Sequence, residues 1–427
     1  MIKITKIINN QKRGTALILS IILILAVGLI ISSGLIYLAF NSIVSTQNKV
    51  QSIQSYYAAE AGIEDSLLRL KKSQQFFSPN TLAVGNSTAN IDISEAIGGS
   101  RTIISAGNTD NRIRKISVAY VVTTDEVSFY YGAQAGPGGI SMGNNSQIQG
   151  NVFSNGSILP GGGGLSDITD TASVAINGNK IDSVNIGGDA YVHSCKDSNI
   201  TGTLNYVSGG SVENCTYGSL VNIGPNEIEA ENLPISPEQI TKWKNEAIAV
   251  GTISGDYILD GGETESLGPI KITGNMLIDN NSILNITGTI YVQGNITLQN
   301  NVLIQLDGDF SSLSGVIISD GKITIQNNAD IQGSGLEGSF LMLLSTNNSL
   351  DPANPAIDVS NNAAGAIFYA SNGVIHLHNN INIREATGYK LALDNNAVIS
   401  YQVGLENVNF TSGPGGSWYV ENWQEIE

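Results

Sequence analysis

Two histidines, His376 and His378, alternate along a segment with the two-residue period of a β-strand. Side chains two residues apart in a strand point to the same face. Such a pair can bind a transition metal when a carboxylate joins it, because imidazole is a common ligand of zinc, copper and nickel. The sequence places no third ligand beside them. We therefore interpret them as solvent-facing side chains and predict neither a metal site nor a cofactor.

The two cysteines, Cys195 and Cys215, are 20 residues apart. This spacing equals one coil of the repeat described below, so they could lie on adjacent coils, within the Cα separation of about 4.4–6.8 Å that a disulfide requires. Their segment is predicted to lie outside the cytoplasm, where thiols oxidise. We favour a disulfide over two unpaired thiols. A metal site is not predicted here, since only His193 could join them.

Four aspartates could gather on one face, as paired carboxylates do in β-helix polysaccharide hydrolases. They are Asp307, Asp309, Asp320 and Asp330. Only Lys322 and Arg384 could accompany them, and no GxSxG, HExxH or P-loop spacing occurs. Scattered acids on an acidic surface are usually solvated, so we predict no catalytic residue and no enzyme. A membrane-anchored carbohydrate-active or carbohydrate-binding protein is the alternative.

Three aromatic residues, Trp418, Tyr419 and Trp423, lie close together in the last part of the sequence. Alternating aromatic side chains can bind sugar rings. More often they cover the end of a repeat structure, whose outermost strand otherwise offers an unpaired edge. We favour the end cap and keep contact with surface glycans as the alternative.

The composition bounds the classes of protein to which the chain can belong. Of its 427 residues, 41% are hydrophobic and 13% are charged, a balance that argues against a mostly disordered chain. The net charge of −17 argues against a nucleic-acid partner, which would need a basic face. Residues 1–72 nevertheless carry eight Lys or Arg and three acids, so this region is expected to meet different surroundings.

An uncharged apolar run spans residues 15–40. As a helix it would be roughly 39 Å long, which exceeds the ~30 Å hydrocarbon core of a bilayer. It is also longer than the apolar region of a cleaved secretory signal. Basic residues lie before it, so the positive-inside rule predicts a single-pass protein of the inner or cytoplasmic membrane. The N-terminus would lie in the cytoplasm and the remainder outside.

The same helix is expected to continue as an amphipathic helix over residues 41–72. That span contains no Pro and one Gly, Gly62. An apolar stripe follows at helical spacing. It is formed by Val50, Ile53, Tyr57, Ala61 and Leu68.

The first 72 residues resemble the N-terminal region of PilX-type minor pilins and related type IV pilus assembly proteins. The resemblance rests on the leader ending in Lys12-Arg13-Gly14, the apolar helix, and the segment Tyr56-Tyr-Ala-Ala-Glu-Ala-Gly-Ile-Glu64. It implies that residues 1–14 are a basic leader and that a prepilin peptidase cuts between Gly14 and Thr15. It also implies that the released helix packs against other pilin-like subunits.

One position departs from the pattern of major pilins. The fifth residue after the expected cut is Leu19, where those proteins usually have Glu. A permanently anchored protein is therefore the alternative to a filament subunit. Leu19, Tyr57, Glu60 and Glu64 are the candidate packing residues on the helix, although solvent-facing charges are the simpler interpretation of the two glutamates.

Residues 73–130 change to a period of two with Gly and Asn turns, which predicts a small antiparallel sheet. A helix followed by such a sheet is how pilin heads are built, so the pattern agrees with the resemblance. The basic cluster Arg112, Arg114 and Lys115 is expected on the solvated face of a strand.

From residue 131 onward, an Asn-Asn pair followed by alternating apolar residues recurs. The pairs begin at residues 144, 280, 300, 327, 361, 379 and 395. The spacing predicts a right-handed parallel β-helix, in which stacked coils bury a continuous core and Asn occupies the corners. A β-sandwich is the alternative. The segments Leu233-Pro-Ile, Ser266-Leu-Gly-Pro, Gly315-Val-Ile-Ile-Ser-Asp-Gly321 and Gly413-Pro-Gly-Gly416 resemble β-helix domains attached to pilin-like anchors in bacterial surface proteins.

A short helix is expected to interrupt the solenoid over residues 236–249. Ser236 is placed as its N-cap, followed by Pro237 in the first turn and Gln239 at the capping-box position. We expect it to brace the solenoid between an N-terminal part at 131–235 and a C-terminal part at 250–427. The whole sequence predicts a structural function: a minor component or assembly factor of a type IV pilus-like system that displays a β-helix for adhesion or contact.

Overall fold

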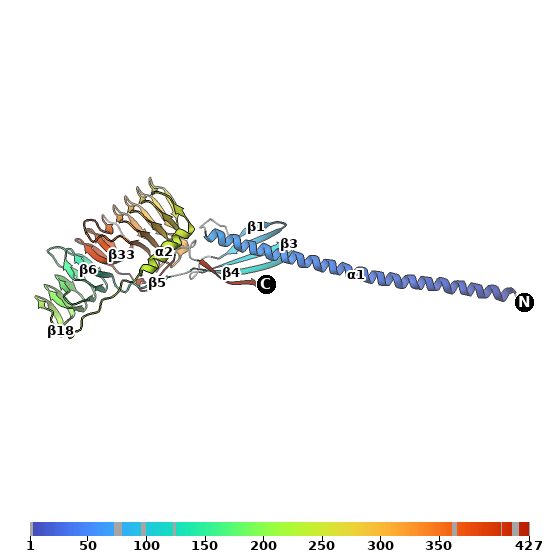
Figure 1. The fold of residues 1–427 in the computed structure, drawn as a ribbon, viewed down its shortest axis with the longest axis horizontal. Coiled ribbons are helices and arrows are strands. Elements are labelled where there is room, and N and C mark those ends of the chain that lie inside the picture. The colour runs from blue at the N-terminus through green and yellow to red at the C-terminus, as the bar shows by residue number, and fades with distance from the viewer. Residues whose placement is uncertain are drawn as a thin grey trace.

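The computed structural model describes residues 3–71, 79–94, 100–122, 125–360, 365–402, 404–411 and 418–426. Helix α1 (Lys3–Lys71) projects from a small sheet, and a β-solenoid lies on the other side of that sheet (Figure 1). The predicted fold class, a long helix followed by mainly β structure with parallel strands, is confirmed.

Helix α1 is continuous because its sequence contains no Pro and is rich in Ile, Leu and Ala. Its apolar part has a mean hydropathy of 2.8 and is unburied in the monomer, so by length and composition it can cross a bilayer. Gly14 and Thr15, the expected cleavage position, lie within this helix.

The head is a five-stranded antiparallel sheet in the order β1-β2-β3-β4-β38. Asp110 and Asn111 join β3 to β4 with positive φ angles, as a tight two-residue hairpin requires. The strands are β1 (Asn80–Val84), β2 (Ser87–Ile93), β3 (Ser100–Thr109), β4 (Arg112–Val122) and β38 (Trp418–Ile426).

Strand β38 corrects the prediction that the C-terminal aromatic residues cap the solenoid. Trp418, Tyr419 and Trp423 lie on this strand, which pairs with β4 of the head. The β-helix therefore does not extend to residue 427. The segment alternates as any strand does, and its partner is about 300 residues away in the sequence, so the local pattern could not identify it.

The chain enters the solenoid at a middle coil, which contains β6 and β7. Strands β6 to β18 build coils in one direction, and β19 to β36 build coils that return toward the starting point. The last coil then pairs in parallel with the first through β35–β6 and β36–β7. In Figure 1 this seam lies between the orange-red coils near the β33 label and the teal coils near the β6 label.

The first half contains the following strands: β6 (Ala133–Met142), β7 (Gln147–Gln149), β8 (Val152–Ser154), β9 (Ile158–Pro160), β10 (Ser166–Ile168), β11 (Ala172–Val174), β12 (Lys180–Asp182), β13 (Val184–Ile186), β14 (Ala190–Val192), β15 (Ser194–Lys196), β16 (Asn199–Tyr206), β17 (Val212–Glu213) and β18 (Thr216–Asn222).

The second half contains β19 (Thr252–Ile253), β20 (Tyr257–Leu259), β21 (Thr264–Leu267), β22 (Ile270–Ile272), β23 (Met276–Ile278), β24 (Ile283–Ile286), β25 (Ile290–Val292), β26 (Ile296–Leu298), β27 (Leu303–Leu306), β28 (Gly315–Ser319), β29 (Ile323–Ile325), β30 (Asp330–Gln332), β31 (Leu341–Ser345), β32 (Ile357–Val359), β33 (Ile367–Leu377), β34 (Asn382–Ile383), β35 (Glu385–Leu393) and β36 (Val398–Ser400). Short 3₁₀ turns η1 (Gly308–Phe310) and η2 (Leu405–Asn407) lie outside the coils.

The Asn pairs occupy corners, as predicted. Asn300 and Asn301 have φ angles of 61° and 62°, which Asn tolerates better than most residues. Their side chains accept hydrogen bonds of 2.9 Å from Asn327 and Asn328 of the next coil. These Asn–Asn hydrogen bonds connect neighbouring coils, as the repeat indicated. The pair at residues 361–362 lies outside the described residues.

Helix α2 (Pro237–Val250) covers the outside of the solenoid. It begins as predicted: the Ser236 side chain accepts a hydrogen bond from the Gln239 N–H. Trp243 is completely buried against the outward faces of β25, β28 and β31, where Tyr291, Val316 and Met342 also lie in the core. The helix therefore braces the second half.

A pair of antiparallel strands connects the head and the solenoid. Strand β5 (Asp125–Val127) carries the chain outward and β37 (Val408–Phe410) carries it back. Phe129 and Phe410 are buried in the same cluster as Trp243. This packing fixes the connection to the middle of the solenoid.

Candidate functional site

The face of α1 that packs on the head sheet lies very close to it. Ala59 and Ile63 are completely buried against a sheet surface that includes Ile103 and Ile116. A Cβ added to Gly107 of β3 would lie 1.8 Å from the Ser55 carbonyl oxygen, so the backbones of helix and sheet nearly touch there. Only glycine fits such an approach.

Polar contacts at the rim hold the helix, the sheet and β38 together. Arg114 donates hydrogen bonds to Ser52 at 2.9 Å and to both carboxylate oxygens of Glu425 on β38. The hydrogen bond with Arg114 lowers the pKa of Glu425 below its usual value. Arg112 donates to Asn48 at 2.8 Å. Arg112 and Arg114 of the predicted solvated cluster therefore fasten the head to α1.

The opposite face of α1 carries the predicted apolar stripe into solvent. Val50, Ile53, Tyr57 and Leu68 are 48%, 55%, 61% and 51% exposed, whereas Ala61 is half-buried. These residues continue from the exposed apolar segment around Leu19, which is 69% exposed. The helix thus presents an unpartnered apolar face opposite its own head sheet.

The two glutamates of the candidate packing set differ in their surroundings. Glu64 is exposed beside the apolar stripe, and Glu60 is half-buried on its flank. Glu60 is three residues from Tyr57 and four from Glu64, so it neighbours both on the helix surface. The two glutamates can add polar contacts to a helix packed on this face.

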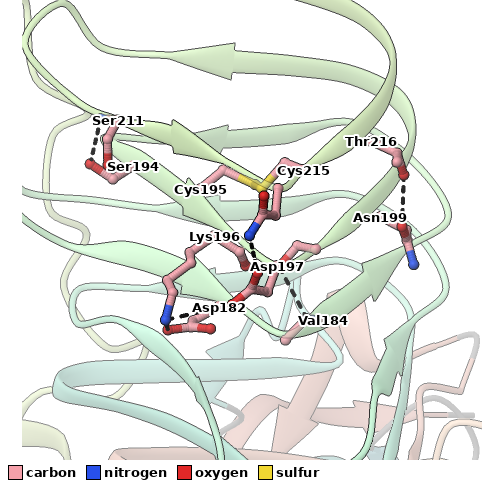
Figure 2. Close-up of a disulfide and its surroundings, with 12 residues drawn as sticks. Asp182, Val184, Ser194, Cys195, Lys196, Asp197, Asn199, Ser211, Cys215 and Thr216 are labelled. Atoms are coloured by element: carbon pink, nitrogen blue, oxygen red, sulfur yellow. Dashed lines mark hydrogen bonds and ion pairs between the residues drawn. A yellow bond between two sulfur atoms is a disulfide. The ribbon is translucent and has the colours of Figure 1, made fainter.

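The disulfide joins two adjacent coils near the outer end of the first half. Cys195 and Cys215 are bonded, with their Cα atoms 6.4 Å apart (Figure 2). Beside them, Asn214 donates to Asp197 at 3.0 Å and Thr216 donates to Asn199 at 2.7 Å. The bond and these hydrogen bonds tie the last coil to its neighbour.

Three of the four aspartates considered for catalysis, Asp307, Asp320 and Asp330, have separate structural partners. Asp320 accepts hydrogen bonds from Lys244 of α2, Tyr291 and Thr346. Asp307 caps η1 by accepting from the Asp309 N–H at 2.9 Å. Asp330 accepts from Gln332.

The histidine pair lies beside carboxylates that the sequence did not reveal. His378 Nε2 is 2.8 Å from an oxygen of Asp358, and Asp394 contacts both histidines. The expectation that no third ligand is near is therefore wrong. Asp358 and Asp394 come from neighbouring coils, and their register with the histidines depends on loop lengths that the sequence pattern does not specify.

Sequence reasoning also missed a buried carboxyl, Glu385 in β35. It is completely buried. One oxygen accepts a hydrogen bond from Thr387, and the other has no hydrogen-bond partner among the described residues. Burial raises the pKa of Glu385 well above its usual value.

The chain thus has the architecture of a long helix, apolar over its first part and able by length to span a bilayer, with an antiparallel head and an appended parallel β-solenoid. No known protein family and no curated protein matches it. Among solved structures, the competence-associated pilin ComZ from Thermus thermophilus is similar over 88% of this chain and 97% of that chain, with 9% identity and a TM-score of 0.20. Likeness at this level establishes neither family nor function. The function proposed below therefore rests on the residues of this chain.

Proposed function

We propose that this protein is a membrane-anchored, pilin-like protein that acts as a minor component or assembly factor of a type IV pilus-like system. The observation that carries the proposal is the two-faced helix α1. One face packs closely against Gly107 of the head sheet, and the other leaves Ile53 and Tyr57 exposed in line with the apolar segment. Exposed apolar surface of this extent marks an interaction site.

The anchor would cross the inner or cytoplasmic membrane once, with lipid around residues 15–40. Lys12 and Arg13 before the apolar run support a cytoplasmic N-terminus. The exposed stripe from Val50 to Leu68 would then stand just outside the bilayer. There it can pack against the helix of another pilin-like subunit or of the assembly machinery.

The acidic solenoid would be displayed outside the membrane for adhesion or contact, and surface glycans are its alternative partner. We propose a structural role for it and not a catalytic one. Asp307, Asp320 and Asp330 each accept hydrogen bonds from different groups of the solenoid. This supports the structural role, because a hydrolase would need paired carboxylates free to act on a substrate.

Site-directed cross-linking tests the assembly role. The variants Ile53→Cys and Tyr57→Cys place a thiol on the exposed stripe, and Thr88→Cys places one on the exposed outer face of β2 as the matched control. The native cysteines are bonded to each other and do not compete. The variants would be expressed in cells with a working pilus system and treated with a thiol-reactive cross-linker.

The expected result is a specific adduct with a pilin-like subunit from both stripe variants and none from Thr88→Cys. Mass spectrometry would identify the partner peptide. If all three variants gave the same adducts, or if neither stripe variant gave one, the proposed assembly role would be wrong.

A further inference from the structure

One outward corner of the solenoid collects side chains with metal-binding chemistry from three successive coils. Asp358 of β32 lies in register with His376 of β33, and His376 lies in register with Ala392 of β35. Two residues further along the chain, His378 and Asp394 follow at the same corner. Parallel stacking therefore brings four residues together that are up to 36 positions apart.

The donor atoms of these side chains converge. His378 Nε2 is 2.8 Å from Asp358 Oδ1, and its Nδ1 is 3.2 Å from Asp394 Oδ2. His376 Nε2 is 3.1 Å from Asp394 Oδ1. One donor atom each from Asp358, His376 and His378 lies within 4.8 Å of the others. Tetrahedral zinc with bonds of about 2.0–2.1 Å holds its ligands about 3.3 Å apart, so small side-chain rotations close the set.

Other coils use the same corner for amide ladders. Two residues beyond the strand position that pairs with Asp358, the earlier coils carry Gln299 and Gln326, and Gln326 donates to Gln299 at 2.7 Å. Gln299 donates in turn to Asp279 at 2.8 Å. At the equivalent position His378 occupies the coil that lies between those supplying Asp358 and Asp394.

A backbone carbonyl orients one of the imidazoles. His376 Nδ1 is 2.9 Å from the Pro352 carbonyl oxygen, which can only accept a hydrogen bond. The proton on Nδ1 leaves the lone pair of a neutral imidazole on Nε2, which faces the carboxylates. Metal-binding histidines are held in this way, with the non-ligating nitrogen donating to a carbonyl or carboxylate.

Charge balance also favours a cation at this corner. The two imidazole rings are 4.0 Å apart, centroid to centroid, and the carboxylates of Asp358 and Asp394 flank them. A divalent cation bound among these side chains would offset the negative charge of the two carboxylates.

We infer that Asp358, His376 and His378 form a binding site for a divalent transition metal such as zinc, with the Pro352 carbonyl orienting His376 and Asp394 orienting His378 through its Nδ1. The side chains of His376 and His378 are 15% and 37% exposed, so a metal can reach them from solvent. Three protein ligands leave one position open for water or a partner's donor. The inference does not depend on the proposed pilus function.

Zinc binding by the full chain in detergent tests the site. The protein would be stripped with EDTA and titrated with Zn²⁺ against a chromophoric chelator. We expect one zinc per chain. His376→Ala and His378→Ala should each weaken zinc affinity at least about 100-fold, which exceeds the usual loss when a residue that only contacts a ligand is replaced. His193→Ala is the matched control, since His193 lies in the other half of the solenoid, and it should bind zinc like the unaltered chain.

A second readout separates loss of the site from loss of the fold. Asp358→Asn keeps the shape of the side chain and should also weaken binding, and the Co²⁺-loaded protein should show a visible absorption band that both histidine variants lose. Circular dichroism would establish that each variant keeps its β structure. Failure of the unaltered chain to bind stoichiometric zinc, or unchanged binding in the two histidine variants, would overturn the inference.

Discussion

Replacing Gly107 by alanine should loosen α1 from the head sheet. The added Cβ would lie 1.8 Å from the Ser55 carbonyl oxygen and 2.7 Å from the Ala59 nitrogen, and both are backbone atoms that cannot rotate away. Gly107 is not among the residues with positive φ, so alanine suits its backbone. To restore an ordinary contact of 3.4 Å, the helix must retreat by about 1.6 Å.

That retreat separates Ala59 and Ile63 from the apolar side chains of the sheet. Overpacking of this kind costs about 1–3 kcal/mol, and the upper value applies because backbone must move. A cost of about 3 kcal/mol corresponds to a roughly 150-fold larger equilibrium population of the state in which the helix–sheet contact is open.

Hydrogen exchange measured by mass spectrometry reports this opening directly. Peptides from residues 52–70 of α1 should exchange roughly 150-fold faster in Gly107→Ala, in the full chain held in detergent. Gly308→Ala is the control, because nothing lies within 4 Å of its added Cβ. Unchanged exchange over residues 52–70 in Gly107→Ala would refute the close packing of helix and sheet.

Three further predictions concern the solenoid. Replacing Cys195 and Cys215 by serine should cost about 3 kcal/mol locally, the entropy of a roughly 20-residue loop, and should accelerate exchange in β18 but not in β25. Because the pKa of Glu385 is raised, this carboxyl keeps its proton in the folded chain while the unfolded chain loses its proton above about pH 4.5, so stability falls as the pH rises. Glu385→Gln should abolish this fall between about pH 5 and pH 8 in denaturant unfolding, whereas exposed Glu337→Gln should not. Asn300→Ala should destabilise by about 2 kcal/mol through left-handed strain and lost ladder bonds, and Asn300→Gly, which removes only the bonds, by about half as much.

Local patterns in the sequence predicted the elements well. The absence of Pro predicted a single helix, and the Asn-Asn repeat predicted stacked parallel coils whose corners Asn occupies. Capping chemistry predicted the start of α2 at Ser236. Each of these features depends on residues within about 30 positions of one another, where backbone preference and side-chain period decide the outcome.

Long-range pairing could not be predicted in the same way. The alternation of Trp418 to Ile426 fits a strand in either the head or the solenoid, and its partner is chosen by the geometry of β4. The seam between β35 and β6 likewise joins segments about 250 residues apart. The sequence indicated His376 and His378 but not Asp358 and Asp394, because the lengths of the intervening coils decide which residues stack beside the histidines.

The central claim, that the chain enters a pilin assembly pathway, is tested most directly at its N-terminus. The full chain would be expressed with and without a prepilin peptidase, and its intact mass and N-terminal sequence would be measured. The account predicts a product that begins at Thr15 only when the peptidase is present, with Leu19 as a tolerated exception. An uncut chain that begins at Met1 in both cases would contradict it and leave a signal-anchored surface protein whose solenoid supplies the function.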